Sequence, residues 1–340
     1  ARETALGFEM RPKGGIISDP TLHYPVPGLF VIPDPQGWSN CGGAVPNCQD
    51  GFINTPRIKD ELKSLRLQAT QELDGVISSL RWNGHEYFGP WFERHDPKVH
   101  DAITGPVEEF LTGDSSLGYD EVPEGGVFVR IGVGAVRRPA EAAFKRFDTY
   151  EIVSPGTWVI DQAQECIEFT HTLPASGGYG YVYRKRTALS GDTLVLEHEL
   201  RNTGAKPITT SVYNHNFFTL DRQPTGPDIV VRFPFDARAA RPIVEGAAIE
   251  SRELRFLRPL EPMQTVFTEV EGFGPAATDY DFQLENRRTG AGVRICGDRP
   301  LSKLLFWCAA TTVCPEPYID ASVGPGATTT WVIAYEFYRV

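Results

Sequence analysis

The sequence predicts an all-β protein, and three observations support this prediction. The chain of 340 residues contains 33 Gly and 27 Pro, which favour turns, together with 20 Phe, 12 Tyr and 6 Trp, which favour strands. Short runs of alternating apolar residues follow one another with turn residues between them. No long stretch repeats with the period of a helix, so we expect many short strands and few helices.

Alternation and turn residues locate individual strands. Residues 75–88 predict a hairpin with Asn83-Gly84 at its turn, because these two residues adopt positive φ angles readily. Residues 127–133 place Val and Ile side chains at every second position, which predicts one continuous strand. Further strands are expected over the segments 194–200, 208–218 and 328–337.

The distribution of proline divides the chain into two parts. Length alone suggests about two domains. Prolines recur from Pro20 to Pro56, however, and prevent long regular elements there. Apolar residues such as Phe30 and Trp38 in the same stretch favour contact with a core over exposure to solvent. We therefore predict an irregular N-terminal arm over 1–58, packed on a single β-sandwich domain over 59–340.

Composition and charge exclude several classes of partner. Apolar residues make up 41% and charged residues 23% of the chain, as in an ordinary globular protein. The formal net charge of −11 repels phosphate backbones and anionic membrane surfaces, so we expect no nucleic-acid or membrane partner. The glycines of Gly132-Val133-Gly134 lack the further glycine and helix of a dinucleotide loop, and we expect no cofactor. Oligomeric state stays open.

Six cysteines bear on compartment and on metal binding. None forms a C-x-x-C pair, so the spacing predicts no structural metal site. Cys41 and Cys48 bracket a short loop rich in Gly and Pro, where a disulfide would remove much chain entropy. Cys308 and Cys314 could close a second loop, or Cys308 could be an ordinary buried residue. A Cys41–Cys48 bridge predicts a secreted or periplasmic protein.

Two segments carry residues suited to proton transfer. His215 stands in Tyr213-Asn214-His215-Asn216, where polar side chains interrupt an aromatic strand. A histidine there can exchange a proton near neutral pH, although a lone histidine is often a core residue bonded to backbone. Glu316 stands between two prolines, and a glutamate on a rigid, partly apolar rim can act as a general base.

These two segments resemble those of the aldose 1-epimerases, the galactose mutarotase-like family. Residues 213–220 resemble its Asn-His-x-Tyr-Phe-x-Leu segment, and Pro-Glu-Pro at 315–317 with the strand after it resembles its C-terminal catalytic glutamate and last strand. The resemblance implies a galactose mutarotase-like β-supersandwich that binds a small sugar or oligosaccharide. It also implies that Glu316 takes the proton of the anomeric hydroxyl while His215 protonates the ring oxygen.

The chain departs from the family where a second histidine is expected. The corresponding region contains His100, Glu108 and Glu109 in place of the His-Gly-Gly segment. Either His100, its neighbours Arg94 and His95, or Glu109 can take that place. Glu109 facing Glu316 would also suit proton abstraction from carbon or cleavage of a glycoside.

Further side chains are candidates for binding the sugar, each with an ordinary structural alternative. Asn214 can bond to hydroxyl groups, and Arg184 can bind a hydroxyl or carboxylate with its planar fork, unless it simply lies on a solvated strand. Tyr119, Trp91 and Trp307 are candidates for stacking on a sugar face, although most such aromatics are core residues.

Three functions therefore stay open at this point. The first is an isomerase that interconverts sugar anomers with His215 and Glu316. The second is another reaction on the same fold, such as that of a polysaccharide lyase, a carbon epimerase or a glycoside-processing enzyme. The third is a sugar-binding protein without catalysis.

Overall fold

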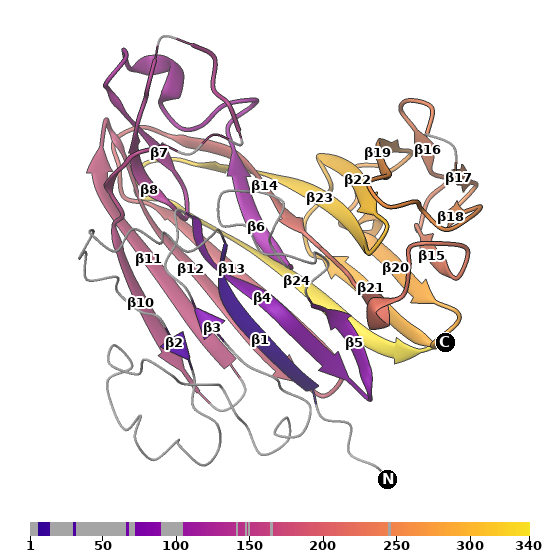
Figure 1. Cartoon of the computed structure of the whole chain (residues 1–340). Coiled ribbons are helices and arrows are strands. Elements are labelled where there is room, and N and C mark those ends of the chain that lie inside the picture. The colour runs from indigo at the N-terminus through magenta and orange to yellow at the C-terminus, as the bar shows by residue number, and fades with distance from the viewer. Residues whose placement is uncertain are drawn as a thin grey trace.

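The computed structural model describes most of the chain from the middle of the sequence onward (Figure 1). The described residues are 6–13, 30–31, 66–67, 72–89 and 105–340, apart from 141, 147, 149, 164, 165, 244 and 245. Within these ranges the regular structure consists of β-strands and three short 3-10 helices, with no α-helix. The predicted all-β class is confirmed.

The larger sheet has ten antiparallel strands. The C-terminal strand lies near the middle of this sheet. On one side of it are strands from residues 157–202, and on the other side are strands from residues 229–297. The order is β10 (Thr157–Gln162), β11 (Cys166–Ser176), β12 (Tyr179–Ser190), β13 (Thr193–Asn202), β24 (Thr328–Arg339), β21 (Ala291–Gly297), β20 (Asp281–Asn286), β15 (Ile229–Arg232), β18 (Glu253–Phe256) and β17 (Ala247–Glu250).

A six-stranded sheet supplies the strands that carry both sequence motifs. Its order is β16 (Arg238–Ala239), β19 (Thr265–Glu271), β22 (Lys303–Ala309), β23 (Thr312–Val323), β14 (Ile208–His215) and β6 (Val107–Leu111). Strands β6, β14 and β23 are thus neighbours, although they come from three distant parts of the chain.

Smaller elements flank these sheets. They are the sheet of β1 (Leu6–Lys13), β4 (Glu72–Trp82) and β5 (His85–Phe88), the sheet of β7 (Val127–Arg130), β8 (Gly134–Arg137) and β9 (Ile152–Ser154), the pair β2 (Phe30–Val31) and β3 (Arg66–Leu67), and the 3-10 helices η3 (Tyr119–Glu121), η4 (Leu220–Arg222) and η5 (Ala277–Asp279). Nowhere in the described ranges is there a helix with the length and apolar character needed to cross a membrane.

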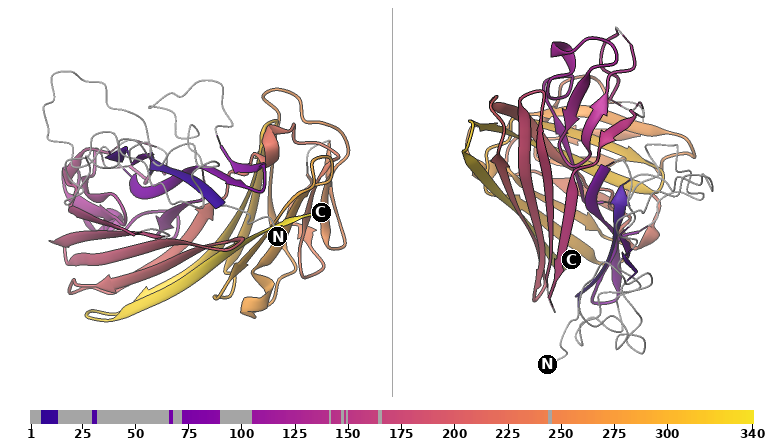
Figure 2. Two further views of the ribbon diagram at one scale, coloured as in Figure 1. Left: turned by 90° about the horizontal axis from the view of Figure 1, so that it is seen from below. Right: turned by 90° about the vertical axis from the view of Figure 1, so that its left-hand side faces the viewer.

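The two large sheets pack face to face through aromatic side chains. Phe110 of β6 lies edge-on to Tyr183 of β12, with ring centroids 5.2 Å apart, and 6.2 Å from Trp331 of β24. Figure 2 shows the long strands β10, β11, β12, β13 and β24 as one curved layer, with β1 and β4 on one side of it. The main hydrophobic core lies between the two large sheets.

Local patterns predicted two elements well. The hairpin of β4 and β5 turns at Asn83-Gly84, whose φ angles are 52° and 85°. In β13 the alternate side chains of Leu194, Leu196 and Leu200 are fully buried, because every second position of a strand faces the same layer.

The prediction of one strand over 127–133 is wrong. Strand β7 ends at Arg130, and the chain turns through Gly132, at φ 85°, into β8. The hydroxyl of Tyr181 accepts a hydrogen bond from the Gly132 N–H at 2.9 Å, which holds this turn against the larger sheet. Apolar residues continue across the turn because both strands of the hairpin are buried.

A disulfide between Cys308 and Cys314 is also excluded, since both are free thiols. In the pairing of β22 with β23, Cys308 lies opposite Val313, whereas Cys314 lies opposite Trp307. The two cysteines are therefore on opposite faces of the sheet. The predicted Cys41–Cys48 bridge lies outside the described residues.

The predicted N-terminal arm falls mostly outside the described residues as well. Two of its segments are strands, since β1 pairs with β4 and β2 pairs with β3. That part of the arm is thus regular structure added to the sandwich. The division of the chain at residue 58 stays a prediction.

An ion pair with no exposed surface links the two layers. The Lys185 ammonium of β12 lies 2.6 Å from a Glu108 carboxylate oxygen of β6, and both side chains are 0% exposed. Asn214 donates to the other Glu108 oxygen at 3.1 Å. Charges that lose their hydration require such partners.

We expect Lys185→Met to lower the free energy of unfolding by about 3–5 kcal/mol, because it leaves the Glu108 charge buried without its cation. Arg186→Met is the matched control: Arg186 lies on the same strand in a largely exposed pair with Glu197 at 2.7 Å. That change should cost at most about 1 kcal/mol in urea unfolding. Equal losses in the two variants would contradict a special role for the buried pair.

Candidate active site

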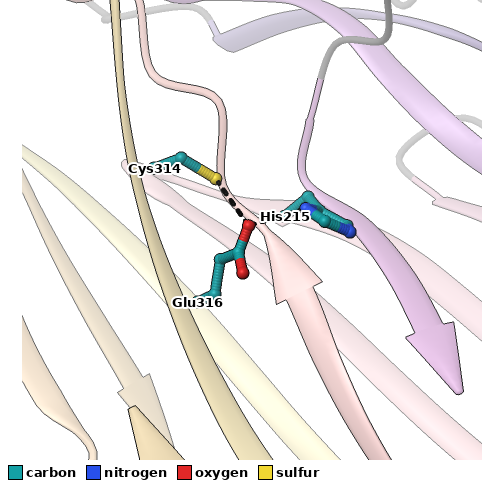
Figure 3. A group of neighbouring side chains, drawn as sticks. All are labelled: His215, Cys314 and Glu316. Carbon is teal, nitrogen blue, oxygen red and sulfur yellow. Dashed lines mark hydrogen bonds and ion pairs between the residues drawn. The ribbon is translucent and has the colours of Figure 1, made fainter. Parts of the chain in front are cut away.

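His215 and Glu316 lie on neighbouring strands and face each other directly. Strands β14 and β23 pair with Tyr213 opposite Tyr318, and continuing this register by two residues sets His215 opposite Glu316. The His215 Nδ1 lies 2.8 Å from the Glu316 Oε1 (Figure 3). Proton transfers to adjacent oxygens of one sugar ring need both groups on one face, within about 5–8 Å of each other. The face is shared, and the contact is closer than expected.

Glu109 of β6 contacts the other ring nitrogen of His215. Strand β6 pairs with β14 so that Glu109 lies opposite Tyr213. Glu109 Oε2 lies 3.0 Å from His215 Nε2 and accepts a hydrogen bond from the Tyr213 hydroxyl, which is itself 2.8 Å from Nε2. The alternatives Arg94, His95 and His100 lie outside the described residues, and Glu109, which is described, reaches His215.

The imidazole of His215 therefore lies between two carboxylates. A neutral imidazole has one N–H and can donate to only one of them. Both contacts to carboxylate oxygens are hydrogen bonds at the same time when the ring carries a proton on each nitrogen. All three side chains are less than 10% exposed, which limits exchange of these protons with water.

Two arginines neutralise Glu109. The Arg146 Nη2 lies 3.0 Å from Glu109 Oε2, and the Arg130 Nη2 lies 3.6 Å from Oε1. Burial lowers the pKa of Arg146, but the charges of Glu109 and Glu316 and the side chain of Tyr318 raise it, and the net shift is upward. The guanidinium is thus held charged over the Tyr213 ring, 5.0 Å from its centroid.

The other side of His215 is apolar. The Phe217 ring stacks parallel to the imidazole, with centroids 5.4 Å apart, and Trp307 packs edge-on to Phe217 at 5.9 Å. Beside them lies Cys314, whose Sγ is 3.7 Å from Glu316 Oε1. Burial, with the nearby Glu316 charge, raises the pKa of Cys314 well above its usual range, so the thiol donates to the carboxylate.

The donor atoms of His215, Cys314 and Glu316 lie within 4.8 Å of one another, close enough to hold a metal ion. Cys314 and His215 both contact the same oxygen of Glu316, Oε1. The second oxygen of Glu316 points away from both residues (Figure 3).

Alternation separates this site from a second polar cluster beneath the sheet. Glu108 and Asn214 each precede a site residue in the chain, and their side chains point to the opposite face. There the His198 ring nitrogen Nε2 lies 3.6 Å from Glu108 Oε1, while Nδ1 bonds to the Tyr183 hydroxyl at 3.0 Å. Burial, with the neighbouring Lys185 charge, lowers the pKa of His198 well below its usual range, which keeps that ring neutral.

Several candidate residues are not brought to His215. Asn214 is buried against Glu108 on the other face of the sheet, so it does not face the site. Arg184 lies on an outward position of β12 and pairs with Glu199 at 3.5 Å and with Glu168 at 3.9 Å. Tyr119 belongs to a separate buried aromatic cluster. Trp307 does reach the site through Phe217, and Trp91 lies outside the described residues.

Sequence reasoning missed other residues of the site. Tyr213, Cys314 and Tyr318 stand two positions from His215 or Glu316, and the two-residue period of a strand could have placed them on the same face. Arg130 and Arg146 come from β7 and the loop before β9, and no local pattern marks them. Only the tertiary structure brings them to Glu109.

Comparison with known proteins gives a likeness of fold. No protein-family model matches the chain, and no curated protein sequence does. A solved structure from Synechocystis sp. PCC 6803 matches with a TM-score of 0.51 at 13% identity, covering 82% of this chain and 92% of that one.

The chain also resembles galactose mutarotase-like structures. A galactose mutarotase-like protein from Lactobacillus casei ATCC 334 matches with a TM-score of 0.48 at 13% identity, covering 79% of this chain and 95% of that one. A proposed aldose 1-epimerase from Escherichia coli K12 has the same TM-score at 15% identity, covering 78% and 93%. At these identities the likeness concerns the fold alone.

We expect Gly105→Ala to disturb the site from outside it. A methyl group at Gly105 would meet the carbonyl oxygen of His215 and the Phe217 amide, both backbone groups at the end of β14. The overlap should cost about 1–3 kcal/mol in urea unfolding and shift the His215 ring signals in a ¹⁵N-histidine NMR spectrum. Gly324→Ala, which meets no atom within 4 Å, is the control and should change neither. Unchanged ring signals in Gly105→Ala would argue against this packing.

Proposed function

We propose that the protein is an enzyme that interconverts the anomers of a free sugar by acid–base catalysis. The observation that supports this function best is the direct contact between His215 Nδ1 and Glu316 Oε1 at 2.8 Å, on one face of the sheet. An acid and a base that share a proton can serve two adjacent oxygens of one ring. The likeness of fold to galactose mutarotase-like structures is consistent with this reaction.

In the proposed reaction the sugar separates the two residues. Its ring oxygen replaces Glu316 Oε1 as the acceptor of the His215 Nδ1 proton, and its anomeric hydroxyl binds to the Glu316 carboxylate. Glu316 removes the hydroxyl proton while His215 protonates the ring oxygen, and the bond between the anomeric carbon and the ring oxygen breaks. The aldehyde then rotates, and the reverse transfers close the ring as the other anomer.

Glu109 and Tyr213 support the acid in this scheme. Glu109 accepts from Nε2 at 3.0 Å, which orients the ring and stabilises its positive charge. Because Arg146 and Arg130 lie at 3.0 and 3.6 Å from the Glu109 oxygens, that carboxylate is held as an anion. Its role is thus to position His215 and to balance its charge, while the chemistry passes through Nδ1.

The same geometry argues against glycoside cleavage by Glu109 and Glu316. Such enzymes place a sugar or a water between two carboxylates, one of which must be protonated. Here the His215 imidazole fills the space between them and contacts both, at 3.0 and 2.8 Å. Glu109 is also neutralised by arginines, which disfavours a role as general acid.

Anomer-resolved ¹H NMR of freshly dissolved aldoses tests the proposal. The parent protein should accelerate the approach to anomeric equilibrium over buffer. His215→Asn and Glu316→Gln should each lower that acceleration by about 10²–10⁴-fold, because each removes one proton-transfer group. Asp320→Asn is the control, since Asp320 is an exposed carboxylate on the same strand that bonds to Ser211 at 2.6 Å, and it should keep the parent rate.

Other outcomes would replace the proposal. No acceleration with any of several aldoses would rule out anomer exchange. Loss of a carbon-bound proton signal in D₂O would indicate epimerisation at carbon, and an unsaturated product absorbing in the ultraviolet would indicate a lyase. Sugar binding without turnover, equal in the parent and Glu316→Gln, would indicate a binding protein.

A further inference from the structure

Three donor atoms of different chemistry meet at the junction of β14 and β23. They are a nitrogen of His215, the sulfur of Cys314 and an oxygen of Glu316, all within 4.8 Å of one another (Figure 3). All three residues are buried. The geometry points to a second use of this cluster: a binding site for one borderline-soft divalent cation of the Zn²⁺ class.

Two of the three donor spacings are close to those around a tetrahedral ion. Typical Zn–S, Zn–N and Zn–O bonds place sulfur and oxygen ligands about 3.6 Å apart and nitrogen and oxygen ligands about 3.4 Å apart. Cys314 Sγ already lies 3.7 Å from Glu316 Oε1. His215 Nδ1 lies 2.8 Å from the same oxygen because a proton holds the two together. Replacing that proton with an ion requires this pair to open by only about 0.6 Å.

The second ring nitrogen of His215 is held in the way a metal-binding histidine requires. Ligating histidines almost always donate their other N–H to a carboxylate or carbonyl. His215 Nε2 lies 3.0 Å from Glu109 Oε2, while Nδ1 lies on the side of Glu316, 2.8 Å from its Oε1. Glu109 is fixed in turn by Arg146 at 3.0 Å. The ring is therefore oriented before any ion binds.

The charge of the cluster also accommodates an ion. A divalent cation would displace two protons, one from the Cys314 thiol and one from between His215 and Glu316. The net charge of the buried cluster is then unchanged, which avoids the cost of adding a charge to a site with little water. A sulfur and an imidazole nitrogen favour Zn²⁺ or Co²⁺ over Mg²⁺ and Ca²⁺, which bind through oxygen ligands.

This site does not depend on the sugar reaction, but the two would compete. An ion on His215 Nδ1 and Glu316 Oε1 occupies the atoms that the proposed anomer exchange uses. If that proposed function holds, Zn²⁺ inhibits the enzyme through its own catalytic pair. Cys314, which has no role in the proton transfers, would then supply the ligand that makes the pair sensitive to metal.

Absorption of the Co²⁺ complex tests the site without any sugar. The parent protein should bind Co²⁺ with the near-ultraviolet band of a cobalt–thiolate bond and the visible bands of tetrahedral cobalt, and Zn²⁺ should displace it. Cys314→Ala should lose the thiolate band and bind one ion fewer per chain. Cys308→Ala is the matched control, because Cys308 is equally buried on the neighbouring strand but faces the other side of the sheet, and it should behave as the parent.

A second variant keeps the test sharp should Cys314→Ala fold poorly. Glu109→Gln leaves all three ligands in place and removes only the carboxylate behind His215, so Zn²⁺ affinity should fall by about 10–100-fold while the thiolate band remains. A parent protein without a cobalt–thiolate band, or equal bands in Cys314→Ala and the parent, would overturn the site. Because these spectra need no turnover, failure of the metal site and failure of the anomer exchange can be told apart.

Discussion

The contact between Glu108 and Lys185 ties the active-site sheet to the layer beneath it. Its two charges are fully buried at 2.6 Å, and such a pair is stable only when its partners are well placed. Glu108 and Glu109 are consecutive in β6, so fixing one beneath the sheet fixes the other above it. The buried pair therefore fixes β6 over β12, and the hydrogen bond from Asn214 to Glu108 fixes it beside β14, where Glu109 reaches His215.

As a result, the two ring nitrogens of His215 have different partners. Nε2 faces Glu109, a carboxylate neutralised by arginines and bonded to Tyr213, so this side of the ring is structural. Nδ1 faces Glu316, whose second oxygen points away from the ring. Below the sheet, His198 is kept neutral by burial and the Lys185 charge. His198 thus lies beside a cation, whereas His215 lies between two carboxylates.

Sequence patterns predicted the fold class and the hairpin of β4 and β5, because strand alternation and turn chemistry are local. The pairing of His215 with Glu316 came from the resemblance to a family. The patterns did not predict the turn at Gly132. The residues before and after the turn are apolar and buried, so their alternation continues across it as in a single strand. The patterns placed Asn214 near the site by its position in the chain, whereas a one-residue step reverses the face. Arg130 and Arg146 depend on packing of distant loops, which no motif encodes.

A proton and a metal ion are alternative occupants of one geometry. The proton holds His215 Nδ1 and Glu316 Oε1 at 2.8 Å, whereas an ion needs a somewhat wider pair and a thiolate. Which occupant prevails depends on Cys314, since its thiol lies 3.7 Å from Glu316 and donates to it while protonated. With only a histidine and a glutamate the pair would be a weak metal ligand. The cysteine, two residues before Glu316 on the same strand face, supplies the third ligand that suits this pair to a soft cation as well.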